Sequence, residues 1–126
     1  KLPPLLSAVS QSGHPVVWAC DPMHGNVFTS EDGLKTRSFD DILHEIRQFF
    51  SACHDHSVWP GGVHLEFTGD DVTECIGGSE AVSEEELNLR YMTLCDPRLN
   101  PRQSLDLAFC IAEFMRQPND RLGNTS

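Results

Sequence analysis

Three short apolar runs, each ending in a polar turn that carries side chains able to bind a metal, restrict the folds open to this chain. The runs and their turns are VVWACDPMHGN at 16–26, GGVHLEFTGDDVTEC at 61–75 and YMTLCDPRLN at 91–100. A run that is apolar throughout fits a strand covered on both faces, as in a parallel sheet. Enough chain separates the runs for a helix and the next strand. The spacing therefore predicts βα units joined by right-handed crossovers.

Helix signals occupy the segments around these runs. Gly13 is a typical residue to follow the end of a helix over 3–12. Ser38 can cap a helix of strong apolar periodicity that runs to about residue 53. A capping box in SEEEL, at 83–87, opens a short helix, and an apolar helical stripe covers 105–115. We expect strands at 16–20, 63–67 and 91–95, a long polar loop at 21–37, and a frayed tail at 116–126.

Composition excludes several classes of partner. The formal net charge is −10 with the acidic residues spread along the chain, whereas nucleic acids and anionic membranes select basic surfaces. No stretch of about 18 apolar residues is present, so no transmembrane helix is expected. The five cysteines form no CxxC pair, which favours reduced thiols in the cytoplasm over disulfides or structural zinc. Because the chain begins with Lys1, we expect a processed or excised piece.

One imidazole and two carboxylates stand out in the three turns. His24 follows the first run, Glu66 lies within the second and Asp96 follows the third. Parallel strands end at one edge of a sheet, which is where α/β folds place their sites. The three side chains together predict a divalent cation with some preference for oxygen ligands.

Each of these residues also has a simpler interpretation. His24 alone could be a loop histidine without a role, Glu66 a core carboxylate in a salt bridge, and Asp96 an Asx turn before Pro97. His64 is better explained as a satisfied core histidine than as a partner of a metal ligand. Its HxE spacing with Glu66 resembles that of zinc deaminases, but the PCxxC that they require is absent.

Basic residues near the turns leave two possibilities open. Lys35 and Arg37 could reach an anionic substrate or lie in solvent. Arg98 and Arg102 could bind phosphate or pair with acidic surface groups. Cys95 precedes Asp96, but a packing thiol is the simpler interpretation.

The three segments resemble the C-terminal part of class II 3-deoxy-D-arabino-heptulosonate 7-phosphate (DAHP) synthases. The resemblance lies in WACDPMHGN, GGVHLEFTGDDVTEC and CDPRLNPRQSLDLAF and extends over about residues 15–115. It implies a (β/α)₈ TIM barrel, of which this chain would be the last three βα units. It also implies a transferase that condenses phosphoenolpyruvate with erythrose 4-phosphate, the first step of the shikimate pathway.

The resemblance assigns residues to a metal-dependent site. The family holds its metal with a Cys, a His, a Glu and an Asp, and the last three fall on His24, Glu66 and Asp96. The Cys belongs to an early strand without a counterpart here. Lys35 is implied near the aldehyde substrate, and manganese or cobalt is the expected metal. Most groups that bind phosphoenolpyruvate would lie upstream.

The expected parent enzyme is therefore larger than this chain. A barrel of this type needs about 250 residues, so we expect a C-terminal fragment that is inactive alone, from a homo-oligomeric parent. It would serve aromatic amino acid synthesis or a secondary, phenazine-type pathway. The alternative is a non-catalytic truncated homologue that binds metal or is completed by a partner.

Overall fold

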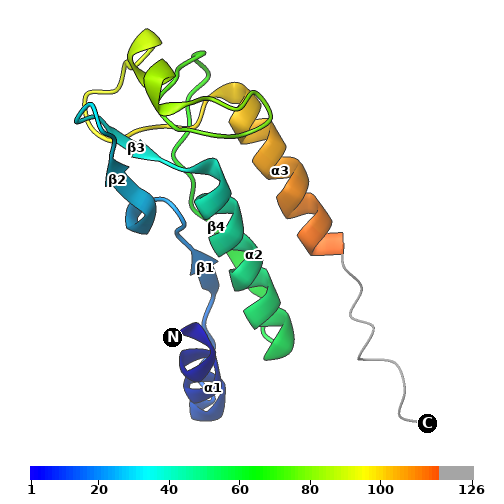
Figure 1. The fold of residues 1–126 in the computed structure, drawn as a ribbon. Coiled ribbons are helices and arrows are strands. Elements are labelled where there is room, and N and C mark those ends of the chain that lie inside the picture. The colour runs from blue at the N-terminus through cyan, green and yellow to red at the C-terminus, as the bar shows by residue number, and fades with distance from the viewer. Residues whose placement is uncertain (117–126) are drawn as a thin grey trace.

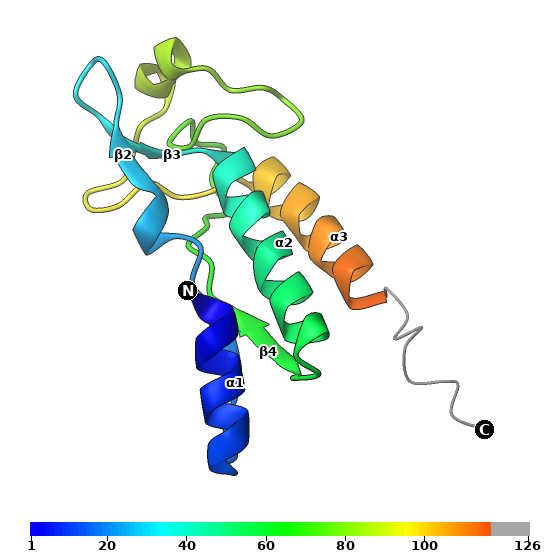
Figure 2. The same cartoon turned by 60° about the horizontal axis from the view of Figure 1, so that its bottom comes forward.

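The computed structural model describes residues 1–116, which form three long helices beside two small sheets (Figure 1). The elements in chain order are α1 (Leu2–Ser12), β1 (Trp18–Cys20), η1 (His24–Asn26), β2 (Val27–Thr29), β3 (Lys35–Arg37), α2 (Phe39–Asp55), β4 (Pro60–Val63), η2 (Glu84–Leu89) and α3 (Pro101–Arg116). Helices α2 and α3 lie side by side in both views (Figures 1 and 2). The loops that precede α3 gather at the end where α2 and α3 begin, opposite α1.

The helices form where local sequence signals predict them. Helix α1 is followed by Gly13 in the left-handed conformation, with φ 71°. Helix α2 is capped by Ser38, whose side chain accepts a hydrogen bond from the Asp41 backbone N–H. The predicted capping box is present at Ser83 and Glu86, although the helix that it opens is a 3₁₀ helix. These signals act within a few residues, so they do not depend on the rest of the fold.

Strands β1 and β4 pair in parallel, as the sequence predicts for the first two runs. Their bounds differ from the predicted 16–20 and 63–67, because β1 begins at Trp18 and β4 ends at Val63. The His64 backbone N–H continues the ladder by donating to the Cys20 carbonyl over 2.8 Å. A side chain at Gly61 would place its Cβ 2.7 Å from the Trp18 carbonyl oxygen, and because this is a backbone atom of the paired strand, the close approach requires glycine. The prediction that the first run is buried on both faces is wrong at its start, because Val17 is 85% exposed.

The predicted third strand at 91–95 does not form in the part of the chain that the structure describes. The backbone N–H groups of Met92 and Thr93 donate to the Glu74 carboxylate instead of to a neighbouring strand. Parallel pairing occurs further along, where Leu99 forms an isolated bridge with Phe67. These backbone N–H groups therefore bind a carboxylate and are not available for hydrogen bonds to a neighbouring strand.

The expected polar loop at 21–37 contains regular structure. It holds η1 and an antiparallel hairpin of β2 and β3, in which Val27 lies opposite Arg37. Gly33, with φ 83°, supplies the left-handed residue of the turn between the two strands. The hairpin carries Lys35 and Arg37 back toward the end of β4.

The main core lies between α2 and α3 and beneath the loops at their N-terminal ends. Its buried members are Met23, Phe39, Ile42, Ile46, Cys75, Leu99 and Leu107. The result is a small α/β domain with a parallel strand pair, which is compatible with part of a TIM barrel. Apart from Arg116, the last residue of α3, the tail predicted at 116–126 lies outside the described residues.

Candidate functional site

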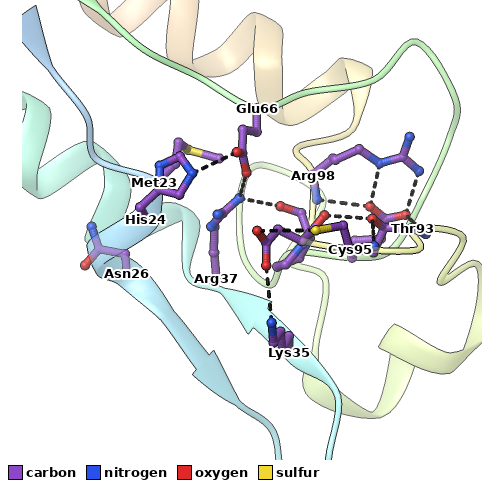
Figure 3. A network of polar contacts seen from close by, with 12 residues as sticks. Met23, His24, Asn26, Lys35, Arg37, Glu66, Thr93, Cys95 and Arg98 are labelled. Carbon is purple, nitrogen blue, oxygen red and sulfur yellow. Dashed lines mark hydrogen bonds and ion pairs between the residues drawn. The ribbon is translucent and has the colours of Figure 1, made fainter.

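His24 and Glu66 meet at the edge where the two parallel strands end. His24 opens η1 directly after β1, and Glu66 follows β4. The two side chains point toward one another in Figure 3, with 3.2 Å between His24 Nε2 and Glu66 Oε1. Parallel pairing explains this approach, because both chains leave the sheet in the same direction.

A buried arginine joins Glu66 to the turn that carries Asp96. The Arg37 side chain is fully buried. Its Nη1 donates to Glu66 Oε2 over 2.5 Å and to the Pro97 carbonyl over 2.6 Å. The Nε and Nη2 atoms of Arg37 have no hydrogen-bond partner among the described residues. The solvent-exposed alternative for Arg37 is therefore wrong, and its charge instead links the two carboxylate-bearing turns.

Asp96 lies beside Lys35 and Cys95. Lys35 Nζ is 3.4 Å from Asp96 Oδ1, and Cys95 Sγ is 3.8 Å from Asp96 Oδ2. The Tyr91 hydroxyl donates to the Lys35 carbonyl over 2.7 Å, which ties the hairpin to the 91–98 loop. The structure thus brings Lys35 to Asp96. Arg37 binds Glu66 and the carbonyl of Pro97, the residue after Asp96, and Glu66 in turn faces His24 (Figure 3).

Glu74 organises the loop that presents Asp96, and the sequence pattern did not single it out. The residue is fully buried and accepts from the backbone N–H groups of Met92, Thr93 and Arg98. Arg98 also donates through Nε and Nη2, each over 2.9 Å. The partner of Arg98 is therefore a buried carboxylate. The available signal was an isolated Glu between Val72 and Cys75, both apolar and buried.

The pKa of Glu74 reflects this environment. Burial alone raises the pKa of a carboxyl group, but the hydrogen bonds and positive charge of Arg98 and the backbone N–H of Met92 outweigh burial. The pKa of Glu74 therefore lies below its usual value of 4.5. The group is ionised at neutral pH and holds the loop as an anion.

A second cluster adjoins His24 on its other side. Asp21 Oδ2 lies 2.7 Å from His24 Nδ1. The rings of His24 and His64 stack with centroids 5.8 Å apart. One ligand atom from each of Asp21, His24 and His64 lies within 4.8 Å of the others, and all three residues are exposed. The interpretation of His64 as a core histidine is therefore wrong.

The structure brings His24 and Glu66 together but leaves Asp96 apart from them: among the described residues, the group of three whose ligand atoms lie together is Asp21, His24 and His64. His24 Nε2 lies 3.2 Å from Glu66 Oε1. When Nε2 carries no proton, both atoms are acceptors, and a cation between them could bind both. The side chains of His24, Glu66 and Asp96 are 55%, 27% and 31% exposed, so an ion can reach them. Imidazole with carboxylates suits a borderline or hard cation.

The buried cysteines are poor candidates for ligands here. Burial raises the pKa of the Cys20 thiol to about 11, with nearby Glu45 and Asp21 adding to the effect. Burial likewise raises the pKa of Cys75 to about 12. Both thiols are buried, and neither belongs to the group of ligand atoms around His24 in the part of the chain that the structure describes.

Comparison with known proteins identifies the family. The model of the Class-II DAHP synthetase family matches residues 1–112. The chain is 52% identical over 115 residues to phospho-2-dehydro-3-deoxyheptonate aldolase AroG of Mycolicibacterium smegmatis, covering 91% of this chain. It is 53% identical over 116 residues to phospho-2-dehydro-3-deoxyheptonate aldolase of Streptomyces coelicolor, covering 92% of this chain. The chain therefore belongs to the Class-II DAHP synthetase family.

The chain is short compared with these relatives. It spans 25% of the M. smegmatis protein and 26% of the S. coelicolor protein. Among the described residues, no helix is both long and apolar enough to cross a membrane.

Proposed function

We propose that this chain is the C-terminal part of a DAHP synthase, an enzyme that condenses phosphoenolpyruvate with erythrose 4-phosphate to give DAHP and phosphate. Family membership supports the reaction class. The observation that carries the proposal is a continuous line of contacts at one sheet edge. It runs from His24 to Glu66, through Arg37 to Pro97, and closes with Asp96 and Lys35.

The proposed metal ligands are His24, Glu66 and Asp96, with manganese or cobalt as the ion and a cysteine from elsewhere in the enzyme as a fourth ligand. A bound divalent cation would act as a Lewis acid on the aldehyde oxygen of erythrose 4-phosphate. Arg37 donates a hydrogen bond to one oxygen of Glu66, and the other oxygen faces His24. Glu74 holds the loop in which Asp96 stands.

Lys35 is proposed to position the aldehyde substrate. Its side chain is 59% exposed and its ammonium group lies beside Asp96, so Lys35 can exchange that carboxylate for an oxygen of the substrate. In the reaction, C3 of phosphoenolpyruvate forms a bond to the aldehyde carbon, water adds at C2, and the phosphate leaves. The shikimate pathway, a cytoplasmic location and a homo-oligomeric parent are part of the same proposal.

A non-catalytic role is the second candidate, and one observation favours it. Large apolar side chains are exposed across the described part of the chain, including Val17, Trp59, Leu94 and Phe109. In an isolated chain these would need a partner, whereas in a complete enzyme the remaining barrel would cover them.

The experiment is phosphate release by the full-length protein that contains this sequence. We expect phosphoenolpyruvate to be consumed only when erythrose 4-phosphate is present, and activity to disappear on chelation and return with Mn²⁺ or Co²⁺. Full activity after thorough chelation would refute the metal assignment. Absence of product under all conditions would favour the non-catalytic candidate.

A further inference from the structure

Asp21 contacts both the backbone and the ring of His24, and no sequence pattern indicated this role. It lies in the turn directly after β1, and its two oxygens have separate partners. Oδ1 accepts from the backbone N–H groups of Met23 over 3.0 Å and His24 over 3.2 Å. Oδ2 faces the His24 ring at Nδ1. The backbone contacts therefore orient the carboxylate, and the carboxylate in turn faces the imidazole.

The contact with Oδ2 determines where the imidazole carries its proton. An ionised carboxylate can only accept a hydrogen bond. Oδ1 of Asp21 accepts from two backbone N–H groups and Oδ2 lies 2.7 Å from His24 Nδ1, so both oxygens act as acceptors. The Nδ1 contact of 2.7 Å has the length of a charge-assisted hydrogen bond, whereas the Nε2 contact with Glu66 is 3.2 Å. A neutral His24 therefore has its proton on Nδ1 and a lone pair on Nε2.

We propose that Asp21 is a positioning residue that holds His24 as the Nδ1–H tautomer and so presents the Nε2 lone pair, on the side of Glu66, to a divalent cation. This inference rests on the metal site of the proposed function. A carboxylate that accepts from the remote nitrogen of a histidine ligand fixes the ring and raises the basicity of the ligating nitrogen. Asp21 would contribute to metal affinity without touching the metal.

The same atoms suggest a competing arrangement, in which a cation binds Asp21, His24 and His64 directly. That cation would take His24 Nδ1 as a ligand and leave the proton on Nε2. The shorter Nδ1 contact favours the positioning role. The two arrangements differ in the tautomer of His24 and in the number of ions bound, so both can be measured.

The test compares Asp21→Asn with Asp21→Ala in the full-length protein that contains this sequence. In Asp21→Asn, Oδ1 can still accept from the two backbone N–H groups, so the turn is kept. The amide NH₂ then faces Nδ1 as a donor and selects the opposite tautomer, with the proton on Nε2. Asp21→Ala loses the turn contacts but leaves the tautomer free. Asp32→Asn is the matched control, because Asp32 is exposed and makes no hydrogen bond or ion pair within residues 1–116.

Metal affinity is measured with Mn²⁺ and Co²⁺ against a competing chelator, without substrates. We expect Asp21→Asn to weaken binding roughly 10- to 100-fold, at least as much as Asp21→Ala, with Asp32→Asn unchanged. Histidine-selective ¹⁵N spectra of the metal-free native protein, in mildly alkaline solution and assigned with His24→Gln, should show His24 protonated at Nδ1.

Three results would overturn the inference. If Asp21→Asn binds metal as tightly as the native protein while Asp21→Ala does not, Asp21 serves only the turn. A second equivalent of metal that disappears in Asp21→Asn would assign Asp21 as a direct ligand. If the native protein binds no divalent cation, the inference falls with the metal site. Tight binding with the expected variant order but no DAHP formed would support the inference and refute the proposed function.

Discussion

Glu74→Gln should destabilise the protein strongly, although Glu74 lies outside the proposed set of metal ligands. The carboxylate is fully buried and accepts hydrogen bonds from five N–H donors, two of them on the Arg98 guanidinium. Glutamine has nearly the same shape but only one acceptor oxygen. Its amide NH₂ would face donors, and Arg98 would lose its counter-ion.

The size of the effect follows from these contacts. Breaking a buried ion pair by removing one partner costs about 3–5 kcal/mol. The Arg98 side chain is 30% exposed and can recover some hydration, so we expect the lower end, about 3 kcal/mol. The assay is chemical denaturation of the full-length protein. Glu80→Gln is the matched control, because Glu80 is exposed and makes no hydrogen bond or ion pair among residues 1–116.

Acid should remove the difference between the native protein and Glu74→Gln. The folded-state pKa of Glu74 is below its usual value of 4.5. Its stabilising effect is therefore fully present above that value and is lost as the pH falls through the folded-state pKa. A destabilisation below about 1 kcal/mol at neutral pH, or one that does not shrink in acid, would refute the assigned role of Glu74.

Three further predictions concern the site and the isolated chain. His24→Ala should weaken metal binding and lower catalysis by at least roughly 10- to 100-fold, because two carboxylates without the imidazole hold and polarise less well; an undiminished rate would contradict the metal assignment. Lys35→Ala should mainly raise the KM for the aldehyde with metal content unchanged, so metal loss measured by elemental analysis would argue against a substrate role. The 126-residue chain alone should aggregate or be partly molten and inactive, because within residues 1–116 β1 pairs with a single strand and apolar side chains are exposed; a monomer in sedimentation that unfolds cooperatively in calorimetry would be the opposite result.

The sequence predicted those features that short-range interactions determine. Helix α2 begins at its capping Ser38, and the left-handed Gly13 ends α1, as expected. The capping box at Ser83 and Glu86 also forms. Each signal depends on backbone N–H groups within a few residues. Parallel pairing between strands on either side of a helix was predicted and forms, but β4 spans Pro60–Val63 where the sequence predicted a strand at 63–67.

The third strand was predicted wrongly for a reason that lies outside its own residues. The 91–95 run is apolar enough for a strand, but a carboxylate distant in sequence occupies its backbone donors. Local pattern contains no information about such a partner. The polarity of residues 21–37 likewise predicted an irregular loop. The segment instead contains a hairpin that turns at Gly33 and returns Arg37 to the core.

For the site, the sequence alone determined which chemical groups stand at the strand exits, and resemblance to a family assigned them roles. Tertiary structure decided which of them touch. His24 meets Glu66 because β1 and β4 run in parallel, and Asp96 joins them only through a buried Arg37. An arginine in a polar sequence has no local signal for burial. Arg37 can be buried because two turns that are distant in sequence supply acceptors for its charge. Those acceptors come together only when the chain has folded.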